Sequence, residues 1–153
     1  MSLAALAAGL FGITGAAILT SGPATAAPPQ IQCTNFSGAG ITDTVSNCTN
    51  SPGQGQPERG SGTIDAAGSH ILTWDKGFLG GRSFQLSNIN FSPGDPVGSP
   101  GNPCRSEYPV EVLVGGTVLS PEPYAGAPVS ATICANPTTH EFIEEPGIPF
   151  TIG

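Results

Sequence analysis

The chain has 153 residues, of which only 10% are charged, and its formal net charge is −7. Its 22 glycines and 16 prolines, about a quarter of the chain, exclude a coiled coil or another long-helix protein. Only four residues are lysine or arginine, which argues against a nucleic-acid partner, and the length allows one ordinary domain.

The N-terminal segment predicts a secretory signal peptide. Residues 3–19 are small or apolar and carry no charge, and Ala24-Thr25-Ala26 matches the small-x-small pattern at which signal peptidase cleaves. We expect a signal peptide at residues 1–26 and a single exported domain at residues 27–153. An uncleaved membrane anchor is the alternative, but this glycine-diluted run is at the lower limit of what spans a bilayer.

The first part of the exported domain alternates short extended segments with turns. Strands are expected at 31–36 and 41–48, on either side of a Gly-Ala-Gly turn, and again at 62–65 and 71–74. Residues 50–62 are rich in glycine and proline and contain no large apolar side chain, so they predict a loop.

The second part continues this pattern. An apolar series runs from 84 to 91, and its change from even to odd positions at Ser87-Asn88 predicts a bulge. A period-2 pattern at 110–114 is followed by Gly115-Gly116, which we expect to turn the chain into a short strand at 117–119. The last strands are expected at 129–133, 142–143 and 148–152. Because Pro149 cannot donate to a strand ladder, the final strand is expected at a sheet edge.

These elements together predict an all-β fold. No window of residues 27–153 shows a helical period over three turns, and the short strands recur at intervals of about 8–12 residues. We expect an antiparallel β-sandwich, with a small β-barrel as the alternative architecture.

The cysteines predict two disulfide bonds. An even number of cysteines in an exported domain is typical of a disulfide framework. Three pairings are possible, and Cys33–Cys48 with Cys104–Cys134 is favoured because each bond joins segments that we expect to be neighbours. No Cys-x-x-Cys pair occurs, and the spacing from the two histidines does not match a zinc site. No metal or other cofactor is predicted.

A series of short motifs carries a resemblance to known proteins. In chain order they are Cys-Thr-x-Phe (33–36), Ser-x-Cys (46–48), Gly-x-Gly-Thr-Ile (60–64), Leu-Thr-Trp-x-x-Gly (72–77) and Pro-Gly-x-x-Phe (146–150). This order resembles small exported proteins of mycobacteria and related actinobacteria that have no assigned function. The resemblance spans most of residues 27–153 and implies a secreted or cell-envelope β-domain, but it implies no catalytic residue.

The densest group of ionisable residues lies near the C-terminus and comprises His140, Glu141, Glu144 and Glu145. His140 and Glu144 can share one face of a strand, so the group is a candidate patch for a ligand or a cation. A solvated acidic edge is the alternative interpretation of the same residues. A pair of catalytic carboxylates would also require a cleft, which the sequence does not indicate.

Two other groups of residues resemble parts of known functional sites, but neither is expected to form such a site. Ser69-His70 with Asp75 resembles part of a hydrolase triad, yet His70 and Asp75 would face opposite sides of one strand and no Gly-x-Ser-x-Gly motif is present. Trp74 and Tyr124, with Tyr108, could form a sugar-stacking platform, although Trp74 is expected to fill the core. We therefore predict no catalytic residue.

The function expected from these features is that of a non-catalytic exported protein. It would serve as a binding or interaction module in the cell envelope or outside the cell, with an unidentified partner there. The alternative is a small secreted hydrolase or carbohydrate-binding protein that uses the acidic C-terminal segment. After signal cleavage, no segment predicts stable insertion into a membrane.

Overall fold

The computed structural model describes residues 30–51 and 58–153, and the predicted signal peptide lies outside these residues. Its elements are nine β-strands and one 3-10 turn, η1 (Gly77–Leu79). The strands are β1 (Gln30–Gly38), β2 (Thr42–Ser51), β3 (Gly60–Asp65), β4 (Ile71–Lys76), β5 (Ser83–Pro93), β6 (Val110–Ser120), β7 (Pro128–Ala135), β8 (Phe142–Glu144) and β9 (Phe150–Ile152). In this part of the chain, no helix is long and apolar enough to cross a membrane.

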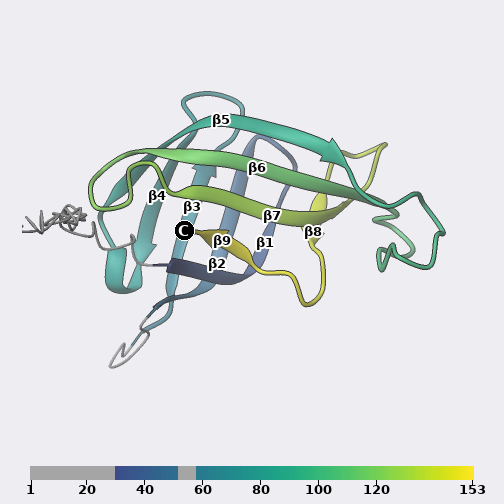
Figure 1. Cartoon of the computed structure of the whole chain (residues 1–153), viewed down its shortest axis with the longest axis horizontal. Coiled ribbons are helices and arrows are strands. Elements are labelled where there is room, and N and C mark those ends of the chain that lie inside the picture. Colours follow the sequence, from purple (N-terminus) through teal and green to yellow (C-terminus); the bar gives the residue numbers. More distant parts are fainter. Residues whose placement is uncertain (1–29, 52–57) are drawn as a thin grey trace, which may run out of the picture.

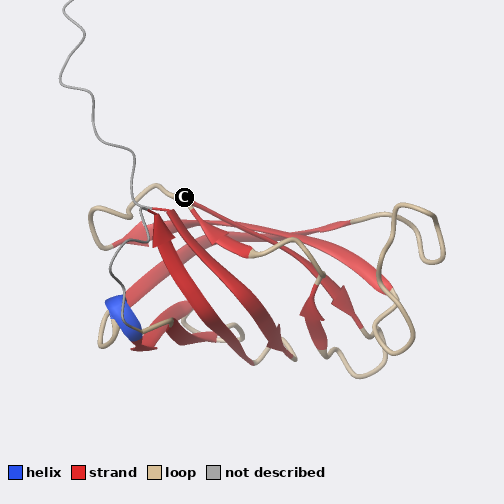
Figure 2. Cartoon of the chain, turned by 90° about the horizontal axis from the view of Figure 1, so that it is seen from below, coloured by secondary structure: helices blue, strands red, loops and turns tan. Residues whose placement is uncertain are grey.

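The strands form a closed antiparallel barrel (Figure 1). Each strand from β1 to β8 pairs with the next in sequence, and β8 pairs back with β1 through Gly38 and Phe142. The ninth strand, β9, also lies between β7 and β1, and pairs with both of them at the opposite end from β8. Figures 1 and 2 show the long strands β5 and β6 extending toward the 94–109 loop at one end of the barrel.

The all-β antiparallel class and both predicted disulfides are confirmed, and the barrel is the architecture that the chain adopts. Cys33 bonds Cys48 across the β1–β2 pair, and Cys104 bonds Cys134 on β7. A barrel forms rather than a sandwich because β8 and β9 fill the gap between β7 and β1. Closure pairs strands that would otherwise be exposed edges.

Two local expectations are wrong. Gly115-Gly116 does not turn the chain, since β6 runs without interruption from Val110 to Ser120. A Cβ atom added to Gly116 would lie 2.7 Å from the Ile89 side chain, so this glycine permits close approach of β5 rather than a turn. The final strand is not at an edge either, because β9 pairs on both sides and Pro149 precedes it.

The predicted bulge in β5 is confirmed. The register of β5 with β6 shifts between Ser87 and Asn90, and Asn88 has a positive φ of 51°. Such a bulge bends a strand and increases its twist.

Part of the hydrophobic core fills one end of the barrel, and the rest of it lines the space at the other end. Trp74, Phe84 and Tyr124 are all buried, with ring centroids 5.7 Å apart for Trp74–Phe84 and 4.7 Å apart for Phe84–Tyr124. Toward the other end of β5 and β6, Ile89 and Val114 are only partly buried, and Phe91 is 67% exposed. The packing therefore stops part of the way along β5 and β6, and the other end of the barrel is hollow.

A candidate ligand cavity in the barrel

A cavity of about 660 Å³ occupies the end of the barrel that the core leaves unfilled. Its walls are largely apolar and come from most of the strands, including Phe36 on β1, Ile64 on β3, Leu86 on β5, Val112 on β6 and Ile133 on β7. The inward-facing positions of these strands alternate with outward-facing ones, so one strand face supplies the apolar lining.

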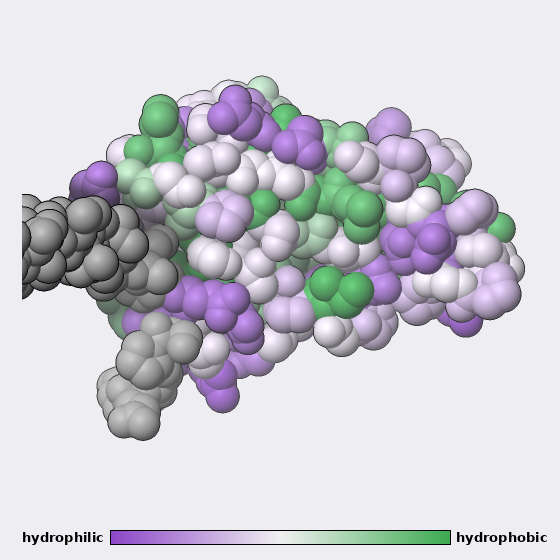
Figure 3. Space-filling view, viewed as in Figure 1, coloured by the Kyte–Doolittle hydropathy of each residue, from purple (hydrophilic) through white to green (hydrophobic). Residues whose placement is uncertain are grey.

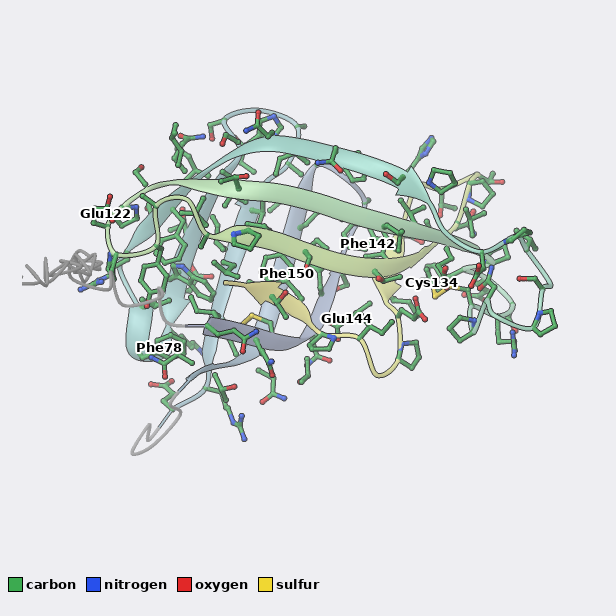
Figure 4. The ribbon with its side chains drawn as sticks, viewed as in Figure 1. Phe78, Glu122, Cys134, Phe142, Glu144 and Phe150 are labelled. Atoms are coloured by element: carbon green, nitrogen blue, oxygen red, sulfur yellow. A yellow bond between two sulfur atoms is a disulfide. The ribbon has the colours of Figure 1, made fainter. Side chains whose placement is uncertain are left out.

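The last two strands complete the wall between β7 and β1. Phe142 and Phe150 line the cavity, and each packs on Phe36, with ring centroids 4.8 Å and 5.1 Å from that ring. Figure 4 shows them on β8 and β9, with Glu144 between them in the chain. The Oε1 atom of Glu144 accepts a hydrogen bond of 2.7 Å from the Phe150 backbone N–H, which ties the two short strands together.

Four polar side chains line the same cavity, near the ends of the strands. They are Asp43, His70, Asn136 and His140. His70 ends the turn between β3 and β4, and His140 lies in the loop between β7 and β8. Both histidines have a positive φ, 56° and 64°, a region that side-chain-bearing residues seldom adopt. The start of β2, the β3–β4 turn and the β7–β8 loop thus bring polar groups to an otherwise apolar cavity.

Asp43 is the buried charged group of this set, with 6% of its surface exposed. Its Oδ1 atom accepts a hydrogen bond of 2.9 Å from the Gly40 backbone N–H. A Cβ atom on Gly38 would overlap Oδ1, so the glycine makes room for the carboxyl group. Burial raises the pKa of Asp43, while the backbone N–H groups of Gly40 and Ala39 oppose that change.

The structure gives the four residues of the predicted C-terminal patch different surroundings. His140 is exposed and lines the cavity, and Glu141 is exposed and accepts a hydrogen bond from Thr139. Glu144 is bound to the backbone of Phe150, whereas Glu145 is buried with 5% of its surface exposed. Within residues 30–51 and 58–153, no three His, Cys, Asp or Glu side chains are grouped so that they could hold a metal ion.

The side chains suggestive of a triad and of a sugar platform do not form such sites. The Ser69 hydroxyl donates a 2.8 Å hydrogen bond to Asp65 rather than to His70. Trp74 and Tyr124 are 1% and 4% exposed, so neither can present a ring face to a carbohydrate. Burial raises the pKa of Tyr124, in keeping with its place in the core. The expectation that Trp74 fills the core is confirmed.

Sequence reasoning missed a pair of buried carboxyl groups, Glu111 and Glu145. They are 7% and 5% exposed, and the two carboxyl groups lie close enough together to influence each other's ionisation. Oε1 of Glu111 also accepts a 2.7 Å hydrogen bond from the Asp95 backbone N–H. Oε2 of Glu145 has no hydrogen-bond partner among the described residues. Burial above all, and then the negative charge of Glu111, raises the pKa of Glu145.

This pair predicts that the protein loses stability as the pH rises above the ordinary glutamate pKa of 4.5. The pKa of Glu145 is higher in the folded chain than in the unfolded chain, so folding keeps a proton that the unfolded chain releases. The stabilisation is complete below about pH 4.5 and is lost as the pH rises through the folded-state pKa. Asp43 and Glu144, whose pKa values burial also raises, act in the same direction.

We expect Glu145→Gln to raise the free energy of unfolding at pH 8 by about 1 kcal/mol, because the amide replaces a charge that must be buried and can donate to Glu111. At pH 4 the gain should disappear. Urea unfolding curves at pH 4, 6 and 8 measure both effects. A variant whose stability follows the same pH profile as the unmodified protein would contradict the assignment.

Outward-facing apolar side chains are separate from the cavity. Figure 3 shows apolar patches on the face that carries β5 to β9. Leu113, Leu119 and Ile143 are 44%, 62% and 41% exposed, and none of them lines the cavity.

Comparison with known proteins assigns no family to this barrel or to its cavity. No protein-family model matches the chain, and neither the curated proteins nor the solved structures include a significant match.

Proposed function

We propose that this protein is an exported, non-catalytic binding protein that holds a small apolar ligand inside its barrel. The observation that carries the proposal is the cavity of about 660 Å³, lined mainly by apolar side chains with a few polar groups. Ligand pockets typically measure about 300–1,000 Å³ and have this composition. An eight-stranded barrel is also wide enough to enclose one small ligand.

The incomplete burial of apolar side chains supports a binding role. Ile89, Val112 and Val114 pack against the core yet remain partly accessible, and Phe91 is 67% exposed although it lines the cavity. Apolar surface left in contact with water costs about 25 cal/mol per Å², and a bound apolar molecule would remove that cost. Covering these side chains would therefore favour ligand binding, whereas in the empty barrel they contribute little to folding stability.

Two disulfides support export, since such bonds persist in oxidising compartments. We further propose that the protein is secreted or held in the cell envelope and binds a partner there. The resemblance to exported actinobacterial proteins is in line with this location. N-terminal sequencing of material recovered outside the cell should begin at Ala27 if the signal peptide is cleaved as expected. Met1 retained in a membrane fraction would favour an anchor instead.

Val112→Trp tests the cavity directly. Val112 lines the cavity and is only partly buried, so a larger side chain can enter the empty space without displacing packed neighbours. We expect the affinity for N-phenyl-1-naphthylamine, a neutral apolar dye whose fluorescence rises in apolar surroundings, to fall at least about tenfold. Fluorescence titration gives the affinity, and thermal unfolding checks that the variant is folded.

The matched control is Leu113→Trp, the neighbouring residue on the outward face of β6. Leu113 is 44% exposed and does not line the cavity, so dye affinity should stay within about twofold. Equal loss in the two variants, or no dye binding by the unmodified protein, would refute the proposal. Turnover of ester or glycan substrates that is lost in Glu141→Gln or Glu144→Gln would instead show the hydrolase considered from the sequence.

A further inference from the structure

The polar groups of the cavity differ in what they can offer to the polar end of a ligand. The lining includes one carboxyl group, on Asp43, two imidazoles and one amide, but no lysine or arginine among the described residues. A carboxylate or phosphate is usually bound by arginine or lysine, through charge-assisted hydrogen bonds. An apolar anion would therefore find no permanent positive charge in this cavity.

The positions of the chain's cations explain their absence from the lining. Lys76 ends β4 and Arg82 lies near Tyr124, both at the packed end of the barrel. The Arg105 guanidinium donates to the Asn102 carbonyl in the 94–109 loop, and Arg59 precedes β3. These four residues are all the lysine and arginine in the chain.

The Asp43 carboxyl group is held in place but is not neutralised. Backbone N–H groups of Gly40 and Ala39 donate to it, and among the described residues no side chain donates to it and no cation is paired with it. An ionised carboxyl group has about four acceptor positions, so this one retains capacity for another donor. The cost of burying the negative charge is larger than the effect of these backbone donors, so the pKa of Asp43 is raised.

Other carboxyl groups near the two histidines add negative charge at the same end. Asp65 is exposed in the turn that His70 ends, and hydrogen bonds from Ser69 above all, with a smaller effect of His70, lower its pKa. Glu141 follows His140 and is exposed. Like charges repel more strongly where water is scarce, so an apolar anion would be disfavoured beside Asp43.

We propose that the cavity selects an apolar ligand whose polar end donates a hydrogen bond, a hydroxyl or a protonated amine, over an apolar carboxylate. This inference rests on the proposed binding function and names the ligand class. The donor group would lie against the Asp43 carboxyl, and the hydrocarbon part would extend toward the apolar wall formed by β5, β6 and β7. A charge-assisted hydrogen bond is about twice as strong as a neutral one.

The test uses three ligands of equal chain length, namely decanol, decylamine and decanoate, each displacing N-phenyl-1-naphthylamine from the full exported domain. The comparison is made at pH 8, where decylamine is protonated and decanoate is ionised. We expect decanol and decylamine to bind at least about tenfold more tightly than decanoate. Asp43→Asn should reduce the preference for decylamine over decanoate to about threefold or less.

Glu141→Gln is the matched control, because it removes one carboxylate near the same end without changing the cavity lining. The tenfold preference should persist in this variant. If Asp43→Asn does not fold, the carboxyl carbon resonance of Asp43 is followed by NMR in the unmodified protein. Decylamine should shift that resonance, and decanoate should leave it in place.

The possible failures are distinguishable. If the dye and all three ligands fail to bind, the proposed function and this inference are both refuted. If the dye and all ligands bind with equal affinity, or decanoate binds most tightly, only the preference for a donor is refuted. An unchanged preference in Asp43→Asn would also show that another group selects the ligand.

Discussion

Phe84→Ala is expected to lower the free energy of unfolding by about 3–5 kcal/mol, the largest effect predicted for a single substitution in this protein. Phe84 is fully buried, and its ring packs against Trp74 and Tyr124. Alanine would leave a cavity that the surrounding strands can only partly close. Because small domains are stable by about 5–15 kcal/mol, this loss is a large fraction of the total.

Phe91→Ala is the matched control, since the same substitution is made on the same strand. Phe91 is 67% exposed and lines the hollow end of the barrel. Its removal should change the free energy of unfolding by about 0.5 kcal/mol or less, while the affinity for the apolar dye falls. Urea unfolding and dye titration measure the two effects. Similar destabilisation by both substitutions would show that the core extends through the barrel and that the cavity is filled.

Replacing Cys33 and Cys48 together with Ala is expected to cost about 3 kcal/mol of folding free energy. The bond closes a loop with a sequence separation of 15 and joins residues directly opposite each other on β1 and β2. Both cysteines are fully buried. Without the bond, the unfolded chain gains conformational freedom, and the core loses two packed sulfur atoms. Denaturant unfolding should show the loss as a lower midpoint for the whole barrel.

The double variant of Cys104 and Cys134 provides the comparison. This bond has the longer sequence separation, 30, and the loop-entropy argument gives it about 3.6 kcal/mol. It ties the 94–109 loop to β7, so its removal should raise amide hydrogen exchange first in that loop and leave β1 to β4 protected. Removal of the Cys33–Cys48 bond should raise exchange in β1 and β2. Identical exchange patterns in the two variants would contradict this division of roles.

Much of the fold is predictable from short-range patterns. The alternation at Val110, Val112 and Val114 correctly indicates a strand, and the phase change at Ser87-Asn88 correctly indicates a bulge. The cysteine pairing follows from expected neighbours along the chain, because Cys33 and Cys48 lie on two strands joined by a tight turn. Each of these inferences depends on residues close together in the sequence, where local backbone preference is informative.

Other features depend on partners that are distant in the sequence. Gly115-Gly116 has the composition of a turn, yet it lies within β6, because Ile89 and Asn90 of β5 pack where side chains would otherwise be. Glu111 alternates with valines along β6, and its burial depends on the backbone N–H of Asp95 and the carboxyl group of Glu145, both distant in the sequence. The four residues of the C-terminal patch lie close together in the sequence, yet contacts with distant parts of the chain give them different surroundings.

The sequence by itself determined the all-β class, most strand positions, the disulfide pairing and the acidic composition. These follow from the period of the side chains, from turn residues and from residue counts. Only the tertiary structure decided that β8 and β9 close a barrel against β1, and that the closed barrel is packed at one end and hollow at the other. The physical reason is that both outcomes depend on long-range strand pairing, and on whether the inward side chains of all strands together fill the enclosed volume.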